Sequence, residues 1–530
     1  MNALAGTGRL VRLILRRDRF VLPLWAVLFA VIPLSLVSAF TSFYPTVEAR
    51  RQLADTAGTN PVFLAFLGPI YSSNLGALVA WRGSAFLIAI GVVSLLTVIR
   101  HTRTEEEAGR RELLGSTVVG RQVGLAAAMI VATGANLVLA IVIGLGMTGR
   151  GLPAAGSFTL GLQYAAAGCI FAGVGAFTAQ LANRSGTARA LAFGVLGLSF
   201  LLRVAGDVSS YKWLSWLTPL GWTEAIRPYD GERWWIFALV AGSVLVLALG
   251  ASVLLSRRDL GAGFLPQRPG RASAAPGFRS PAALAWRLHR NLLFGWAITF
   301  AVLGGMLGSV AASLADLIKS SPQMQALIGR LGGSSVITDA YFAGTAGMFA
   351  LVAGGYAIQA SLRMRSEETS LHGELVLATS VGRIRWAASH LLFAFAGPAA
   401  VLAALGLAAG LVHGMNVNDI AGQSLRILAG AIVQLPAVWT LSGLAIFLFG
   451  LFPRYAGFSW GALAIAVFLG QLGAVLQFPR WALDVSPFTH IPRVPGGEFN
   501  VMPLIILLGI AAMLTAAGLV GFRRRDFGRG

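Results

Sequence analysis

An acidic segment of this chain occurs twice, and the second copy begins 262 positions after the first. The first copy starts at Arg103 with RTEEEAGRREL, and the second starts at Arg365 with RSEETSLHGEL. Aligned without a gap, the copies pair Arg103, Glu105, Glu106, Glu112, Thr117, Gly120 and Arg121 with Arg365, Glu367, Glu368, Glu374, Thr379, Gly382 and Arg383. Each half also ends in Arg-Arg-Asp, at Arg257 and at Arg524. A repeat of this length in an apolar chain predicts two membrane half-units in one polypeptide.

The composition is that of a membrane protein. Hydrophobic residues make up 56% of the chain and charged residues only 12%, with a mean hydropathy of +0.74. A soluble domain is typically about 25% charged. The net charge of +20 does not indicate nucleic-acid binding, because the arginines lie between apolar runs and not on a soluble domain. The single cysteine, Cys169, excludes a disulfide within the chain and a cysteine-based metal cluster.

Twelve apolar runs are long enough to cross a bilayer, for which a helix needs about 20 residues. They predict an all-α integral membrane protein with two tandem halves of six transmembrane helices. The first half, 1–256, contains runs near 20–41, 82–100, 122–147, 158–182, 189–206 and 234–256. The second half, 286–530, contains runs near 292–314, 346–363, 386–413, 424–452, 456–477 and 501–522. Prolines and glycines in the intervening stretch, 257–285, predict a flexible linker.

The arginines predict the orientation of the chain. They concentrate in one set of loops, which includes the N-terminal segment, both acidic segments, the linker and the C-terminal tail. The positive-inside rule therefore places both termini and both acidic segments in the cytoplasm. The first apolar run is longer than the about 7–15 residues of a cleaved signal peptide, so we expect an uncleaved anchor. The preceding segment, Arg9 to Arg17, alternates cationic and apolar residues and is expected to lie on membrane lipids.

The acidic segments predict short cytoplasmic helices between the second and third spans of each half. In the first copy, Thr104 and Glu107 have the spacing of a capping box. Glu106 with Arg110, and Glu107 with Arg111, have the i,i+4 spacing of stabilising ion pairs. A single copy would be typical of a solvated surface loop. Because the pattern recurs at the matching place in the other half, we interpret both copies as solvent-facing docking surfaces.

The first acidic segment, Glu106-Glu107-Ala-Gly109-Arg-Arg-Glu112-Leu-Leu, resembles the coupling helix of ABC-2-type (type V-like) exporter permeases. Six spans per half and an amphipathic N-terminal helix are similar to the same family. The fused form, with Trp-Leu-Thr-Pro-Leu-Gly-Trp-Thr-Glu at 216–224, resembles polyketide-antibiotic (tetronasin-type) exporters. The second copy departs from the motif, since Leu371 stands at the position of Gly109, so the two docking helices are expected to be unequal.

This resemblance implies an ATP-driven exporter of hydrophobic or amphiphilic compounds in a bacterial cytoplasmic membrane. The lysines, Lys212 and Lys319, do not lie in a P-loop sequence, so we expect no cofactor in this chain and place ATP and Mg²⁺ in a separate ATPase, in two copies. The implied coupling residues are Arg103, Glu105, Glu106, Glu107, Gly109, Glu112, Arg121, Arg365, Glu367, Glu368, Glu374 and Arg383. The implied substrate-path residues are Phe86, Phe200, Tyr356 and Gln471.

Two other functions remain open. An ion-coupled secondary carrier also has six plus six spans, but such carriers usually need titratable groups within the bilayer, and the apolar runs contain no central Asp or Glu. A lipid or glycolipid exporter of the same ABC architecture would have a similarly apolar path. A membrane-embedded enzyme is not favoured, because no acid–base or metal-ligand cluster is visible.

Polar residues inside the apolar runs have two interpretations. They either contact substrate or form hydrogen bonds between helices, and we favour the second, which is the commoner role. The residues are Asn136, Gln180, Gln359, Gln434 and Gln471. Gly304-x-x-x-Gly308 has the spacing of a surface where two helices pack closely.

Overall fold

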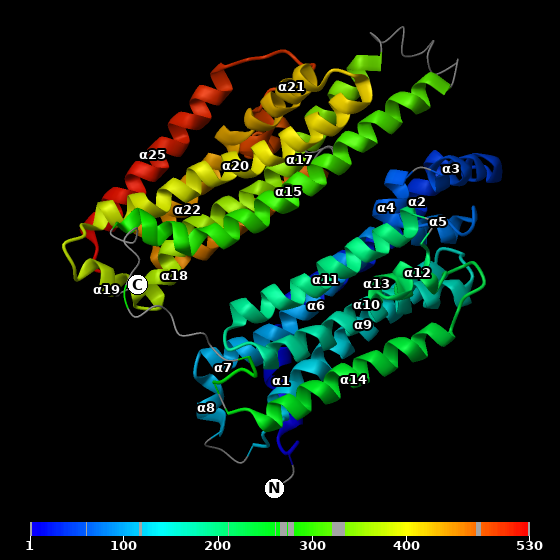
Figure 1. Cartoon of the computed structure of the whole chain (residues 1–530), viewed down its shortest axis with the longest axis horizontal. Coiled ribbons are helices and arrows are strands. Elements are labelled where there is room, and N and C mark those ends of the chain that lie inside the picture. Colours follow the sequence, from blue (N-terminus) through cyan, green and yellow to red (C-terminus); the bar gives the residue numbers. More distant parts are fainter. Residues whose placement is uncertain are drawn as a thin grey trace. The chain divides into compact units, whose positions relative to one another are not determined.

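The computed structural model describes residues 3–59, 61–115, 119–209, 211–259, 261–265, 273, 280–320, 334–472 and 479–527. All regular elements in these ranges are helices. They divide into two compact units, Met1–Gly270 and Arg271–Gly530 (Figure 1).

Eleven helical runs within the described ranges are long and apolar enough to span a membrane. In unit 1 they are Val21–Phe43, Ala85–Glu107, Val123–Thr148, Ala154–Leu181, Ser185–Val208 and Trp235–Arg257. In unit 2 they are Pro281–Ala311, Thr338–Thr369, Arg383–Val417, Ile420–Leu451 and Met502–Arg524. Each overlaps a predicted run, which confirms an all-α, multi-pass architecture. The remaining predicted run, 456–477, falls on α23 (Ser459–Leu472) and on residues outside the described ranges, so twelve spans stay a prediction.

Unit 1 is built around α10 (Ala154–Leu181), whose alanines and glycines are buried along most of its length. Small residues let neighbouring helices approach closely, as is common in membrane bundles. The helices that pack on α10 include α6 (Ala85–Ile99), α9 (Val123–Thr148), α11 (Ser185–Val208) and α14 (Trp235–Arg257). The remaining elements are α1 (Thr7–Arg17), α2 (Val21–Phe43), α3 (Val47–Thr59), α4 (Pro61–Leu67), α5 (Leu75–Gly83), a π-helical segment (Arg100–Thr104), α7 (Glu105–Glu107), α8 (Arg110–Gly115), α12 (Trp213–Trp216) and α13 (Pro219–Ala225).

In unit 2, α22 (Leu435–Leu451) packs against α17 (Ser334–Ser361), α20 (Arg383–Val417) and α25 (Met502–Arg524). The remaining elements are α15 (Pro281–Ser320), α18 (Arg363–Thr369), α19 (His372–Leu377), α21 (Ile420–Ile432), α23 (Ser459–Leu472), α24 (Arg480–Leu483) and the 3₁₀ segments Pro453–Phe458 and Pro487–His490.

The contact between α15 and α20 depends on glycine. A Cβ atom added to Gly304 would lie 2.2 Å from the carbonyl oxygen of Leu405, and one added to Gly308 would lie 2.5 Å from that of Ala409. Real Cβ atoms essentially never come this close, so a larger residue would force the two helices apart. The predicted close-packing role of Gly304-x-x-x-Gly308 is therefore confirmed.

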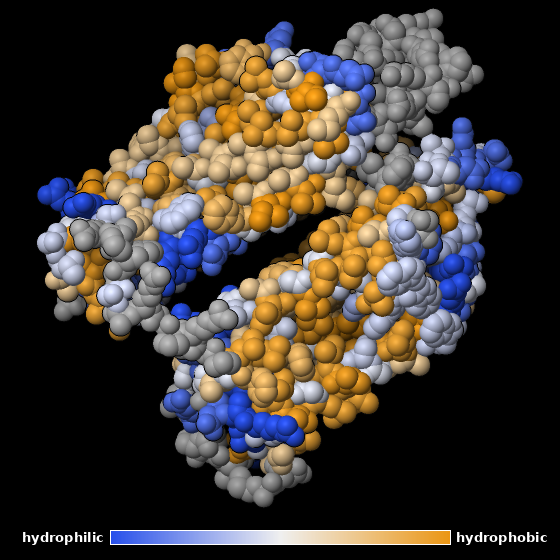
Figure 2. Space-filling view, viewed as in Figure 1, coloured by the Kyte–Doolittle hydropathy of each residue, from blue (hydrophilic) through white to orange (hydrophobic). Residues whose placement is uncertain are grey.

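The outer surfaces of the helices are apolar. Figure 2 shows hydrophobic residues along the helices of each unit and hydrophilic residues near the helix ends. Large apolar side chains such as Leu24 and Val246 are 71% and 68% exposed. Soluble proteins rarely expose continuous apolar surface on this scale, whereas the hydrocarbon of a bilayer covers it without cost.

Most polar residues inside the spans bond to neighbouring helices, as predicted. Asn136 of α9 donates to Ser94 Oγ of α6 over 3.0 Å, and Gln359 of α17 accepts from Trp296 Nε1 of α15 over 3.2 Å. Gln434 makes no such side-chain bond among the described residues, and its buried Oε1 has no partner there, as is also true of Asn136 Oδ1. The side chain of Gln471 lies outside the described part of the structure.

Candidate functional site

Glu106 of the first acidic segment lies in a buried Arg–Glu–Arg triad. Its two carboxylate oxygens accept from both terminal nitrogens of Arg258, each over 2.7 Å, and Arg103 Nη1 donates to it over 3.1 Å. The three side chains are only 1–4% exposed. A bidentate arginine–carboxylate pair is among the strongest polar contacts in proteins. The triad therefore fixes Arg258, the residue directly after α14, to the segment that follows α6.

The second acidic segment forms the same triad. Glu368 accepts from Arg525 Nη2 over 2.9 Å and from Arg365 Nη1 over 3.2 Å. In both units, an arginine at or just before the start of the following long helix also bonds to this triad. Arg121 donates to the carbonyl oxygen of Arg258, and Arg383 donates to that of Arg525. The repeated acidic segment and the repeated Arg-Arg-Asp sequence are thus two parts of one structural unit.

The predicted capping box and i,i+4 pairs are wrong. Thr104 has helical dihedral angles and makes no capping bond, because the chain passes from α6 into α7 through a π-helical segment. Glu107 instead accepts from the backbone N–H of Ser185, over 3.0 Å, at the start of α11. Arg110 pairs with Glu105 over 2.6 Å, and Arg111 donates to the carbonyl oxygen of Arg121. Contacts from distant parts of the chain have replaced the local ones.

The first acidic segment also contacts α1. Arg17, at the end of α1, bonds to Glu105, and Glu105 is held from the other side by Arg110. Through Glu105, Glu106 and Glu107, three consecutive glutamates join the segment to α1, α14 and α11. In unit 2, Glu367 pairs with Arg363 over 2.9 Å within α18.

A sharp corner follows each triad. Gly109 has φ +71° between α7 and α8, and Leu371 has φ +61° between α18 and α19, so the backbone turns in the same left-handed conformation at matching positions. Beyond the corners, Glu112 and Glu374 are exposed, and neither carboxylate has a hydrogen bond or ion pair with the described residues. The prediction that the segments face solvent is therefore wrong for Glu106, Glu367 and Glu368, and it holds for Glu112 and Glu374.

The two corners should respond oppositely to substitution. A Cβ at Gly109 would meet nothing within 4 Å, so Gly109→Ala should destabilise the protein through its φ alone, by about 1 kcal/mol. Leu371→Gly should relieve the same strain and leave stability equal or higher. Thermal unfolding of the two purified variants beside the wild type checks the signs. A drop for Leu371→Gly as large as that for Gly109→Ala would contradict this account.

A second charged cluster lies at the other end of α11. Arg203 Nη1 is 2.7 Å from Glu224 Oε1 of α13 and 3.6 Å from Asp207 Oδ2. Arg203 Nη2 also donates to the carbonyl oxygen of Ala65 over 2.9 Å. A single arginine therefore faces two carboxyl groups. Sequence reasoning missed this cluster, because Glu224 lies outside the apolar runs; its signal was Arg203 inside the run 189–206, with Asp207 directly after that run.

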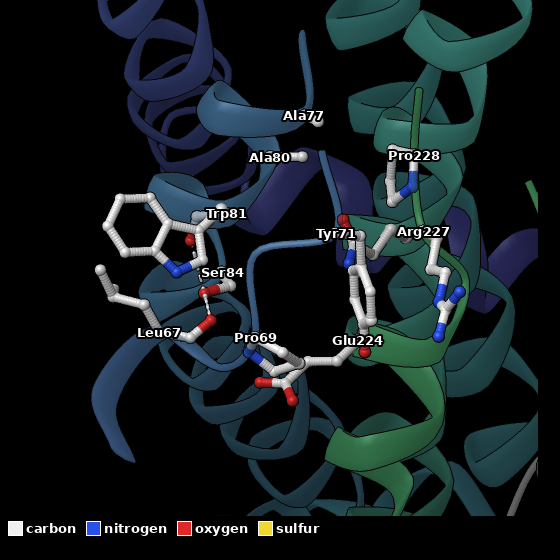
Figure 3. A pocket seen from close by; sticks show the side chains of 11 residues that line it. Leu67, Pro69, Tyr71, Ala77, Ala80, Trp81, Ser84, Glu224, Arg227 and Pro228 are labelled. Carbon is white, nitrogen blue, oxygen red and sulfur yellow. Dashed lines mark hydrogen bonds between the residues drawn. The ribbon is translucent and has the colours of Figure 1, made fainter. Parts of the chain in front are cut away.

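Glu224 borders a small cavity of about 30 Å³, enough for about two water molecules at most (Figure 3). Burial raises the pKa of Glu224 well above its ordinary value; nearby Arg203 opposes this effect, and Asp207 adds to it. Beside it, the Arg227 guanidinium lies 4.0 Å from the centre of the Tyr71 ring. The Glu224 carboxyl group therefore keeps its proton at pH values at which an exposed carboxyl group is ionised.

The substrate-path predictions find no direct support in the packing. Tyr356 is fully buried in the core of unit 2, and its hydroxyl donates to the carbonyl oxygen of Phe393 over 3.4 Å. Phe86 and Phe200 are partly buried against the cores of unit 1. The side chain of Gln471 is outside the described part of the structure. Their role in a substrate path stays a prediction.

Comparison with known proteins gives the family. Residues 278–523 match the family model described as the C-terminal domain of the multidrug efflux system permease Rv1217c. Over 527 residues, the chain is 42% identical to the multidrug efflux system permease protein Rv1217c of Mycobacterium tuberculosis (strain ATCC 25618 / H37Rv), an alignment that covers 99% of this chain and 96% of that protein. The chain, with its membrane-length helices and paired triads, therefore belongs to the Rv1217c-like multidrug efflux permeases.

Proposed function

We propose that this chain is the membrane subunit of an ATP-driven exporter of hydrophobic or amphiphilic compounds, and that a separate ATPase binds at α8 and α19. The observation that carries the proposal is the repeated corner. In each unit a buried triad is followed by a sharp turn and then by an exposed glutamate, Glu112 or Glu374. The family membership supports efflux as the direction of transport. The proposal includes the ABC-2-type architecture of twelve spans, with both termini in the cytoplasm of a bacterial cell.

The base of each corner is suited to transmit movement. In unit 1 the acidic segment bonds to the ends of α1, α11 and α14, and the bond to Arg258 after α14 is buried, whereas the bonds of Arg17 and Glu107 lie nearer the surface. A push on α8 would therefore reach several long helices at once. Rigid-body movement of half-units is the usual basis of alternating access.

The corner of unit 2 also has apolar surface. Leu371 is 57% exposed and Leu375 is 72% exposed, on either side of the exposed Glu374. Interfaces between proteins commonly combine an apolar centre with a charged rim. An ATPase surface with a hydrophobic groove and a cationic edge would fit α19.

Loss of both exposed glutamates should uncouple the partner. In the double variant Glu112→Ala/Glu374→Ala, we expect roughly tenfold weaker binding of the ATPase, the size of effect that loss of interfacial charge commonly has. Folding should be unchanged, because both carboxylates are solvent-exposed. The measurement is the concentration dependence of ATPase activity with the reconstituted permease.

The matched control is Glu48→Ala/Glu498→Ala, which removes two exposed acids outside the acidic segments. This variant should bind and stimulate the ATPase like the wild type. Full coupling in the Glu112/Glu374 variant, or an equal loss in the control, would remove α8 and α19 as the docking surface.

Ion-coupled transport is the second candidate, and the Arg203–Asp207–Glu224 cluster favours it. A buried carboxyl group that exchanges a proton is what a proton-coupled carrier requires. Reconstituted vesicles separate the two candidates. Substrate accumulation driven by ATP with the partner, and insensitive to a proton gradient, supports the exporter. Accumulation that follows an imposed pH gradient and disappears in Glu224→Gln would replace it.

A further inference from the structure

A cavity of about 900 Å³ lies entirely within unit 2. Ligand pockets for drug-sized molecules usually measure about 300–1,000 Å³. Along α17, residues spaced three or four positions apart line it, so they share one face of the helix. These residues are Ala340, Ala343, Gly344, Gly347, Met348 and Leu351. Because most of them are small, this face of α17 leaves space that larger side chains would fill.

A break in a membrane-length helix borders the same cavity. The run Ile420–Leu451 is interrupted between α21 and α22, and Gln434 lies at the interruption. Pro436 follows, and its nitrogen has no hydrogen to donate to the preceding turn. Irregular backbone at membrane depth is tolerated only where protein or a polar cavity surrounds it, and discontinuous helices often mark substrate sites.

Two buried polar groups in the cavity wall have no partner among the described residues. Gln434 is 4% exposed and its Oε1 is unpaired; Ser486 is 2% exposed and its Oγ is unpaired. An unpaired buried polar atom costs about 1–3 kcal/mol. Such a cost, present twice in one cavity, is offset if a ligand supplies the missing hydrogen bonds.

The rest of the wall defines the kind of ligand. Phe488 and Ile491 are apolar, and the charged residues that border the cavity balance, with Asp339 and Asp484 against Arg480 and Arg493. Asp339 is in addition paired with Arg426. This lining favours an uncharged molecule with an apolar body and a hydrogen-bond donor.

The matching place in unit 1 has much less space among the described residues. There the counterpart is the cavity of about 30 Å³ beside Glu224, which is bordered by Trp81 and Gln163. Trp81 precedes Ala343 by 262 positions, the period of the repeat, so an indole fills unit 1 where unit 2 has a methyl group. Trp81 is fixed there by a bond from Nε1 to the carbonyl oxygen of Gly68, over 3.0 Å. The helix that carries Gln163, α10, is continuous.

We propose that the unit 2 cavity binds uncharged amphiphilic molecules through Gln434 and Ser486, and that the corresponding place in unit 1 does not. Its use as the substrate site rests on the efflux function proposed above. Binding itself requires neither ATP nor the partner, so it can be tested on the full chain alone.

Cysteine protection provides the test. The chain has a single cysteine, Cys169, which is buried in unit 1 and gives a low background. Gly344→Cys places a thiol in the cavity, where an added Cβ meets nothing within 4 Å. The probe is N-phenyl-1-naphthylamine, an uncharged aromatic amine with an N–H donor. At ten times its Kd, it should slow maleimide labelling of Gly344→Cys roughly tenfold.

Three further variants make the result decisive. Gly509→Cys, on α25, is equally unhindered and exposed, and its labelling should not change. Added to Gly344→Cys, Ala343→Trp should abolish protection, and Gln434→Leu should weaken it several-fold. Equal slowing at position 509 would mean partition of the probe into lipid, and it would overturn the proposal. Unchanged protection after Ala343→Trp, or no protection at position 344, would also overturn it.

These outcomes are independent of the energy source. If the probe protects position 344 but transport follows a proton gradient, the proposed ATP-driven function fails and the cavity assignment stands. If ATP-driven efflux is found and position 344 is never protected, the cavity assignment fails and the proposed ATP-driven function stands.

Discussion

Replacement of Glu106 or Glu368 by alanine should destabilise the protein far more than replacement of any exposed acid in the same segments. Each change leaves two arginines without their shared carboxylate, in a site where Glu106 and Glu368 are 4% and 1% exposed. Breaking a buried ion pair by removal of one partner costs about 3–5 kcal/mol. We expect low yields and a marked fall in the apparent melting temperature of the purified full chain.

Glutamine and the exposed neighbours provide the controls. Glu106→Gln keeps the shape of the side chain and can still accept hydrogen bonds, so its loss should be smaller than that of Glu106→Ala. Glu112→Ala should melt like the wild type. If Glu106→Ala and Glu112→Ala are equally stable, the triad does not hold the end of α14 in place. Loss of transport in Glu106→Ala would then need another explanation.

The second large effect should be a pH dependence of stability that originates at Glu224. Its pKa is raised in the folded protein, so between its ordinary value of 4.5 and the raised value the folded state binds more protons than the unfolded state. Its contribution is fully present below pH 4.5 and is lost as the pH rises through the folded pKa. The slope for one proton is at most about 1.4 kcal/mol per pH unit.

Glu224→Gln imitates the protonated side chain and should flatten this dependence. The charged and titratable groups around it are Arg203, Asp207, Arg227 and Tyr71. They remain in the variant, so the difference between the two melting curves reports Glu224 together with its interaction with Asp207. We expect the wild type to lose more stability than Glu224→Gln between pH 5 and pH 8. Parallel curves would show that Glu224 is ionised throughout this range.

The apolar runs were enough to predict the helical architecture, and the repeat located the acidic segments, but neither predicted the triads or their contacts. Local rules assigned Glu106 to Arg110, a pairing worth about 0.2–0.5 kcal/mol. Glu106 pairs with Arg258 and not with Arg110, because a buried, charge-assisted bond is worth about 1.5–3 kcal/mol. The repeated Arg-Arg-Asp sequence contained the missing information. Both it and the acidic segment recur in each half, as is expected if the two sequences contact each other in each unit.

The cavities could not be predicted from residue patterns in the sequence. The contrast between the two units depends on one exchange, Trp81 against Ala343, and on the helix interruption at Gln434. Both matter only through the packing of distant segments. Gln434 was expected to bond to a neighbouring helix, as Asn136 does through its amide nitrogen, and only the assembled structure shows that its side chain makes no such bond among the described residues.

The difference between Trp81 and Ala343 also shows what a single continuous polypeptide makes possible. In a pair of identical subunits, every substitution appears at two symmetric positions, so a change that opens one side opens the other. Here each position mutates alone. Unit 1 could therefore keep a filled interior at this position while unit 2 acquired a cavity. The change in one unit did not require the same change in the other.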